Sequence, residues 1–216
     1  MSWLGTLKDT VTRNPKSLTD SERTRLAHNI IQMSGFAAAT VTYAPLPVID
    51  FVAITPIQAS MVMAIGRLCG RELSMRQSTA ILLELASVCG AGLLARQLFT
   101  AASKFLLPGF GGIVAGPYAF AVTWAMGRTA MKYFEDPEML RGNLKKYFKE
   151  SLEEGRRFFS PEAFAAFRKK YGAKVSEFIS GAKRNGKTKP TRRRASARRA
   201  PRKSTKRKAS NPPHAP

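Results

Sequence analysis

The sequence predicts an all-α protein: a bundle of about six to seven helices with apolar helical hairpins, followed by a disordered basic tail. Two observations predict the bundle. Apolar residues recur at three- and four-residue intervals through most of the chain, as on one face of a helix, and no alternation with a period of two extends far enough to form a strand. A third observation predicts the tail, because the last segment has too few apolar residues to offset the entropy of ordering it.

The charge of the chain is concentrated at its end. The 216 residues carry a formal net charge of +22, and the fourteen Lys and Arg residues between 183 and 208 leave only +8 for everything before them. The two cysteines, Cys69 and Cys89, form no C-x-x-C pair. This spacing favours buried free thiols in a reducing compartment over a metal site. The first twenty residues lack an apolar core, so no signal peptide is expected.

The chain is expected to open with a short amphipathic N-terminal segment, residues 1–18. This segment would dock on the body or act as an interfacial membrane anchor. An apolar helical domain is expected over residues 19–135. It starts with a capping box, in which Thr19 begins a helix and Glu22 has the spacing to bond back to it. Pro45 and Pro47 end this helix after a long uncharged run.

The next helix carries one acid near its start and one amide in its apolar face. Asp50 can cap the helix or stabilise its first turn, and Thr55-Pro56 is a second candidate start. If the helix continues through Pro56, Gln58 falls within an apolar stripe. A buried amide needs a hydrogen-bond partner, so Gln58 is a structural or partner-binding candidate. The stripe comprises Phe51, Ile54, Gln58, Met61, Ile65 and Leu68.

A third helix is predicted from Gln77 to about Leu107. Glu84 lies among its apolar residues, where an unpaired buried carboxylate would be costly. Two interpretations stay open. Glu84 is exposed on an amphipathic helix, or it has a partner such as Arg96 or forms an intramembrane polar site.

Pro108 and three glycines break the chain before a fourth helix, which is expected to open at Ile113 with Pro117 near its start. Gly112 and Gly116 have the spacing of a membrane helix contact, and a close helix crossing in a soluble bundle explains them almost as well. A stripe of small residues would let another helix approach closely. It comprises Ala115, Ala119, Thr123 and Gly127.

Residues 136–180 are expected to form an amphipathic helical extension of two helices. In the first, apolar residues such as Leu144 and Phe148 share one face against Lys and Glu on the other. The second starts at Ser160-Pro161-Glu162, which combines a cap, a first-position proline and an N-terminal acid.

Residues 181–216 are expected to form a disordered basic tail that binds polyanions. Without Phe, Tyr or Trp, the tail cannot stack on bases, so binding to nucleic acid would be nearly independent of sequence. Positive charge would equally attract an anionic membrane surface. The polyanion-binding candidates are Lys183, Arg184, Lys187, Lys189, Arg192, Arg193, Arg194, Arg198, Arg199, Arg202, Lys203, Lys206, Arg207 and Lys208.

No catalytic, cofactor-binding or metal-binding constellation is visible. Residues 181–188 match the P-loop pattern G-x-x-x-x-G-K-[ST], but a P-loop needs a strand before it and a helix after it. Here an amphipathic helix precedes the match and a basic tail follows it. His28 and His214 have no partner at catalytic or ligand spacing, and His28 is interpreted as a helix-face residue near a polar boundary.

The chain resembles one family in four motifs: Pro-Leu-Pro-Val-Ile-Asp at 45–50, Ile57-Gln58, Pro108-Gly109, and Thr123-Trp-Ala-Met-Gly127 followed by Tyr133-Phe134. It is similar to the YcjF-like group of bacterial domains of unknown function, which are found with, or fused to, Era-type GTPases. The resemblance covers residues 30–135. It implies a helical, membrane-associated module with a GTPase partner, and it carries no catalytic residue.

These observations predict a non-enzymatic, membrane-associated helical module that works with a GTPase and has no cofactor or small-molecule substrate. The tail would bind anionic lipid or nucleic acid, and the body could form a homo-oligomer. The expected location is the cytoplasmic face of the bacterial inner membrane, with apolar helices that insert or form a soluble core. The alternative is a soluble helical protein that binds DNA or RNA through its tail.

Overall fold

The computed structural model describes residues 17–42, 49–89 and 111–186, with 49–53, 89, 111–114, 139–141 and 182–186 described by their backbone alone. Within these ranges the chain forms six helices and no strand, which confirms the predicted fold class. The helices are α2 (Asp20–Thr42), α3 (Ile49–Leu68), α4 (Met75–Cys89), α6 (Gly111–Glu135), α7 (Pro137–Phe158) and α8 (Pro161–Gly186). The N-terminal segment up to residue 16, the Pro45–Pro47 turn, residues 90–110 and the tail from 187 lie outside the described residues.

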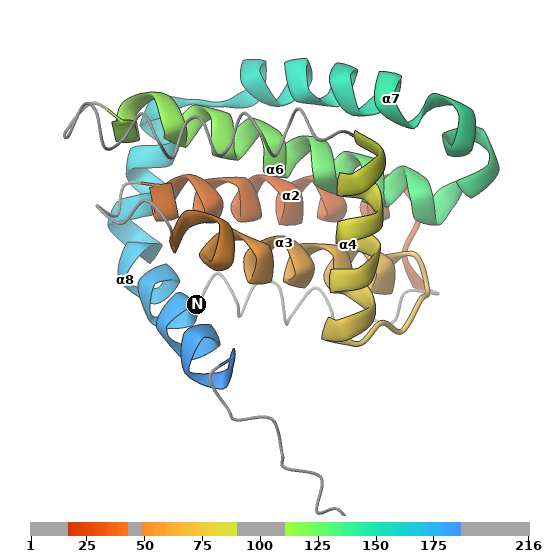
Figure 1. Ribbon diagram of the computed structural model, residues 1–216. Coiled ribbons are helices and arrows are strands. Elements are labelled where there is room, and N and C mark those ends of the chain that lie inside the picture. The colour runs from red at the N-terminus through yellow and green to blue at the C-terminus, as the bar shows by residue number, and fades with distance from the viewer. Residues whose placement is uncertain (1–16, 43–48, 90–110, 187–216) are drawn as a thin grey trace, which may run out of the picture.

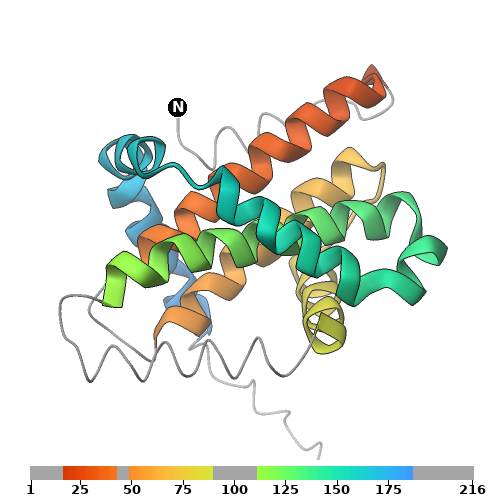
Figure 2. The same ribbon diagram turned by 90° about the horizontal axis from the view of Figure 1, so that it is seen from above.

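The helices pack around α6. Figure 1 shows α2, α3 and α6 side by side, with α7 along α6, α4 across one end of the group and α8 at the other end. Contacts between α6 and each of α2, α3, α4 and α7, and between α2 and α8, agree with this view. Figure 2, seen from above, shows α7 crossing over α6. All six helices contribute to one hydrophobic core.

Local capping fixes the starts of three helices. The Thr19 hydroxyl accepts from the Glu22 N–H at 3.3 Å, and the Glu22 carboxylate accepts from the Thr19 N–H at 3.0 Å, which confirms the predicted capping box. Ser160 caps α8 by accepting from the Ala163 N–H at 3.1 Å. A capping box that the sequence analysis overlooked, Ser74 with Gln77, places the start of α4 at Met75 and not at Gln77.

Helix α3 continues through Pro56, so Thr55-Pro56 is not a second start. Asp50 lies inside its first turn and not at the N-cap, at the end where the helix dipole favours an acid. The helix ends at a Schellman motif, in which the Arg71 N–H donates to the Gly66 carbonyl at 2.8 Å. Gly70 there has a φ of 75°, which a residue with a Cβ rarely adopts.

Helix α6 is buried on nearly every side. Every residue from 119 to 127 is buried, including Thr123 and Trp124. The predicted small-residue stripe lies in the core, and a Cβ on Gly127 would lie 2.6 Å from Ile31. The helix begins at Gly111 and not at Ile113, so Pro117 stands in its interior, beyond the first turn.

Helices α7 and α8 are amphipathic, as predicted, and bury their apolar faces in the common core. Leu144 and Phe148 of α7 are buried, as are Phe164, Phe167 and Val175 of α8. Helix α8 continues to Gly186, past the predicted start of the tail at 181. The first six residues of the P-loop match are therefore helical, which is incompatible with a phosphate-binding loop.

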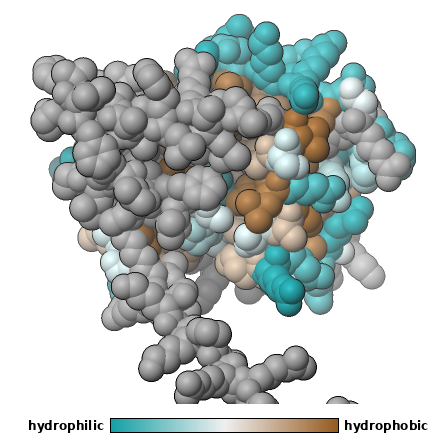
Figure 3. Space-filling view, viewed as in Figure 1, coloured by the Kyte–Doolittle hydropathy of each residue, from teal (hydrophilic) through white to brown (hydrophobic). Residues whose placement is uncertain are grey.

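The sequence analysis left open whether the apolar helices insert into a membrane. Within residues 17–42, 49–89 and 111–186, no helix is both long and apolar enough to cross one. Three large apolar side chains of α4, Met75, Leu83 and Val88, are exposed. Figure 3 shows apolar surface on this side of the molecule.

Gly155 is predicted to be essential for the crossing of α6 and α7. A Cβ at this position would lie 2.9 Å from the Trp124 Cβ and 3.0 Å from the Ala121 Cα, and backbone cannot move aside as a flexible side chain can. Gly155→Ala should therefore destabilise the protein by about 1–3 kcal/mol in chemical denaturation. Gly142→Ala is the matched control in α7, because no atom lies within 4 Å of its added Cβ. It should stabilise by about 0.5–1 kcal/mol, and an equal response of both variants would contradict this account.

Candidate functional site

Gln58 finds its partner inside the bundle. Its Nε2 donates to the Thr123 hydroxyl at 3.1 Å, across 65 positions of sequence. Gln58 is 8% exposed and Thr123 is fully buried. The bond joins α3 to α6 where both helices are otherwise apolar, so it satisfies the buried amide and sets the register of the two helices.

A second polar contact joins three helices at the edge of the core. Arg128 of α6 approaches His28 of α2, with its Nη1 2.6 Å from the His28 Nε2, and its Nε lies 3.2 Å from a Glu154 carboxylate oxygen of α7. The Nε–H makes no hydrogen bond in the described residues, so the contact with Glu154 is an ion pair. We call these three residues the polar cluster. Its charged side chains are one-quarter to one-third exposed.

Burial and the neighbouring Arg128 favour the neutral form of His28. Burial lowers the pKa of His28 below its usual value, and the nearby Arg128 charge lowers it further against a weaker opposing effect of Glu154. A neutral imidazole whose Nε2 accepts from Arg128 carries its proton on Nδ1. The acceptor nitrogen is then occupied, which makes His28 a poor general base.

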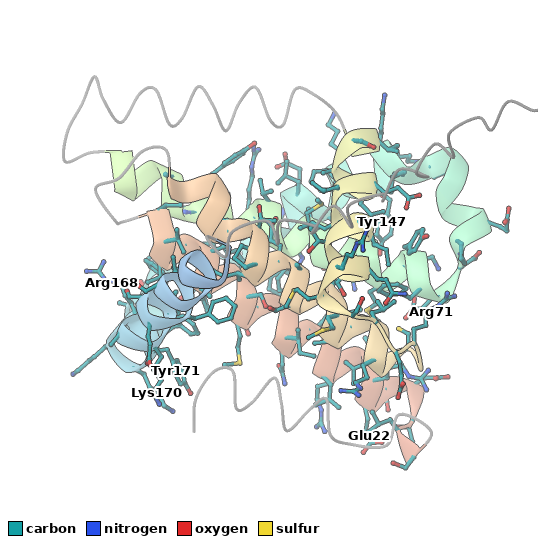
Figure 4. All side chains as sticks on the ribbon, turned by 60° about the horizontal axis from the view of Figure 1, so that its bottom comes forward. Glu22, Arg71, Tyr147, Arg168, Lys170 and Tyr171 are labelled. Carbon is teal, nitrogen blue, oxygen red and sulfur yellow. The ribbon has the colours of Figure 1, made fainter. Side chains whose placement is uncertain are left out.

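Aromatic rings surround the polar cluster. The His28 ring lies 5.7 Å from Trp124, and Trp124 stacks on Phe158 at 4.9 Å between ring centroids. Burial is also the main cause that raises the pKa of Tyr147, whose place on the bundle is shown in Figure 4. Grooves of about 640 Å³ beside His28 and about 660 Å³ beside Glu154 and Phe158 open onto solvent. The arrangement offers paired charges and rings, with no activated nucleophile.

Among the candidates whose side chains the structure describes, it brings together Gln58 and Thr123. Glu84 is exposed on α4, which supports the first of its two interpretations. Gly116 is buried in α6, and Gly112 is described only as helical backbone, as is Asp50 in α3. Among the tail candidates, Lys183 and Arg184 belong to the last turns of α8, and those from Lys187 onward lie outside the described residues.

The polar cluster is the feature that the sequence analysis missed. His28 was expected to have no functional partner, but Arg128 lies beside it from 100 positions further along the chain. The available signal was Arg128 itself, the first charge after the long uncharged run of α6. A cation at the end of such a run is a candidate for pairing at the edge of a core.

Metal-ligating side chains and the Cys69 thiol are two further kinds of reactive group within the described residues. In the described part of the chain, no three His, Cys, Asp or Glu side chains gather closely enough to hold a metal ion. Cys69 is a free, partly buried thiol, and burial raises its pKa to about 11. It is therefore protonated and unreactive at neutral pH.

Removing one partner of the Gln58–Thr123 bond should cost more than removing both. Thr123→Val leaves the Gln58 amide buried without its acceptor, and we expect a loss of about 1–3 kcal/mol. The double variant Gln58→Met/Thr123→Val should lose less than the sum of the single variants, because no unpaired amide remains. Urea unfolding of the four proteins measures this coupling. Strictly additive losses would show that the bond contributes nothing to stability.

The polar cluster predicts a pH dependence of stability. Because the pKa of His28 is lower in the folded than in the unfolded chain, the unfolded chain binds more protons below the unfolded value of about 6.5. Stability from this group is complete above that pH and falls as the pH decreases towards the folded pKa. When the pH is lowered from about 7.5 to 5.5, the melting temperature of His28→Gln should therefore fall less than that of the wild type.

His214→Gln is the matched control, because His214 is the other histidine of the chain and lies in the segment that the sequence predicts to be a disordered tail. It should keep the wild-type pH profile. If His28→Gln kept that profile too, the titration of His28 would not contribute to stability.

Comparison with known proteins identifies the family of the chain. Residues 7–157 match the family described as a domain of unknown function, DUF697. The chain is 28% identical over 143 residues to magnetosome membrane protein 22 of Magnetospirillum gryphiswaldense, covering 62% of this chain and 72% of that protein. No solved structure matches. The YcjF-like subgroup and the GTPase association are not established by these matches. The family match spans the core helices α2 to α6 and most of α7, and this chain therefore belongs to the DUF697 family.

Proposed function

We propose that this chain is a non-catalytic, membrane-associated helical module. The observation that carries the proposal is the similarity over 143 residues to a protein named as a membrane protein. The polar groups of the bundle support the non-catalytic part of the proposal, because Gln58, His28 and Glu154 are each paired with a residue of a neighbouring helix. Such pairs hold helices together, and the pairing of His28 and Glu154 makes these two groups less suited to proton transfer.

The basic tail is proposed as the first point of contact with a polyanion. Its fourteen Lys and Arg residues would each contribute roughly 1 kcal/mol near an anionic lipid surface at low salt. Nucleic acid is the alternative polyanion, since counterion release would drive binding equally well. The similarity to a membrane protein favours a lipid surface. The cytoplasmic side of a bacterial membrane is proposed from the positive charge of the tail.

A GTPase is proposed as the protein partner, on the strength of the resemblance in the Pro45–Asp50 turn and the motifs that follow it. Affinity capture with the full chain, in parallel with GDP and with a non-hydrolysable GTP analogue, tests this. A GTPase retained in one nucleotide state only would support the partnership. Capture of no GTPase in either state would remove it without affecting the membrane proposal.

Deleting residues 187–216 should show whether the tail or the helical body binds the anionic surface. The deletion starts after α8 ends at Gly186, so the helical content per residue of the body should not fall. Flotation with phosphatidylglycerol-containing vesicles should show that the full chain binds at low salt and is released at high salt. The deleted chain should bind these vesicles at least about tenfold more weakly, because it loses most of the tail cations.

Neutral phosphatidylcholine vesicles and a DNA duplex are the controls for this experiment. Binding of the full chain to DNA but to neither kind of vesicle would contradict the membrane proposal and favour the nucleic-acid alternative. An unchanged salt response after deletion would mean that the tail is not the polyanion-binding element.

A further inference from the structure

An apolar groove with a cationic rim lies where α8 begins. It encloses about 710 Å³, within the usual range for a small-molecule site. Its floor continues into the aromatic core, since Phe159 lies 5.5 Å from Phe120 and 5.7 Å from Phe164 between ring centroids. We call it the α8 groove. It is lined by Pro117, Phe159, Pro161, Phe164, Ala165, Arg168 and Lys169.

Positive charge dominates the exposed side of α8. Arg168, Lys169, Lys170 and Lys174 are all exposed, against the two exposed acids Glu162 and Glu177 of the same helix. Figure 4 shows Arg168 pointing outward from α8, away from Lys170 and Tyr171. Lys170 is held over the Tyr171 ring at 5.2 Å, whereas Arg168 and Lys169 line the groove. The ligand that complements the groove therefore combines an anionic end with an apolar end.

The backbone N–H groups of four residues that line the groove are not available to a ligand. Pro117 and Pro161 have no N–H, and the N–H groups of Phe159 and Phe164 donate to the carbonyls of Gly155 and Ser160. An extended peptide in the groove would thus find no backbone donor in these four residues for its own C=O groups. An acyl chain has no such groups to satisfy.

We propose that the α8 groove binds an anionic phospholipid, with its acyl chain against Phe159 and Phe164 and its phosphate at Arg168 and Lys169. The proposal rests on the membrane association proposed above and names the lipid class that this site selects. Lipid in the groove at the start of α8 and the tail cations that follow its end at Gly186 would then hold the protein to the same anionic surface.

The test compares two neighbouring alanines of α8 in the full chain. Ala165 lines the groove and Ala166 does not, and both are exposed. Ala165→Glu and Ala166→Glu change net charge and helix propensity equally. The probe is monomeric dihexanoyl phosphatidylglycerol, titrated below its critical micelle concentration and followed by NMR. We expect Ala165→Glu to weaken binding at least about fivefold, the equivalent of one lost cation at a lipid surface, and Ala166→Glu to leave binding nearly unchanged.

A second pair tests the cationic rim without adding negative charge. R168Q/K169Q should weaken binding clearly more than K170Q/K174Q, although both remove two cations from exposed positions of α8. Circular dichroism of each variant checks that the helices are intact. Dihexanoyl phosphatidylcholine and glycerol 3-phosphate, tested on the wild type, should both bind more weakly than phosphatidylglycerol. Phosphatidylcholine keeps the acyl chains but has no net negative charge. Glycerol 3-phosphate keeps the phosphate group but has no acyl chains.

The outcomes distinguish the proposal of a lipid-binding groove from the general proposal of membrane association. Equal affinity of Ala165→Glu and Ala166→Glu for dihexanoyl phosphatidylglycerol would overturn the lipid-groove proposal. Binding of glycerol 3-phosphate as strong as that of phosphatidylglycerol would overturn it too. Vesicle binding by the full chain could still persist through the tail. Groove-dependent binding of the short-chain lipid without any binding to vesicles would support the groove and contradict membrane association. If an acidic amphipathic peptide perturbed the groove and phosphatidylglycerol did not, the site would dock protein and the lipid proposal would be wrong.

Discussion

Close packing around α6 is the constraint on which the bundle depends. A helix buried on nearly every side needs partners that approach it closely from several directions. Gly127 gives room to Ile31 of α2 and Gly155 brings α7 against the backbone of Ala121, while Gly35 of α2 fits against the Phe120 ring. At each of these three glycines, the absence of a Cβ lets two helices approach closely. The long uncharged run in this part of the sequence is accounted for, within residues 115–127, by burial against other helices of the same chain.

Polar side chains occur where this apolar packing meets another helix or solvent. Gln58 and Thr123 lie inside the core, and their side chains form a hydrogen bond with each other. The polar cluster lies at the edge, where Arg128 connects α2 and α7 through His28 and Glu154. Polar pairs of this kind penalise alternative registers, because any shift would leave a buried group unpaired.

The sequence predicted best what is local and worst what joins distant positions. The caps at Thr19 and Ser160 followed from residues two or three positions away, and the apolar faces of α7 and α8 followed from helical periodicity. The need of Gln58 for a partner was clear, but nothing in the sequence could choose Thr123 from 65 positions away. The partnership of His28 was missed for the same reason. The α8 groove was beyond prediction because its walls come from α6, the α7–α8 connection and α8.

Helix α8 is continuous from Pro161 to Gly186, and this continuity has a mechanical consequence. At a rise of 1.5 Å per residue, the nineteen residues from Arg168 to Gly186 form a rod of about 27 Å. The chain beyond Gly186 therefore departs from a point fixed by that rod and not from a flexible joint at the bundle. A surface engaged at one end of the rod meets the other end at a defined distance and angle. The orientation of the bundle on that surface is then a property of a single helix.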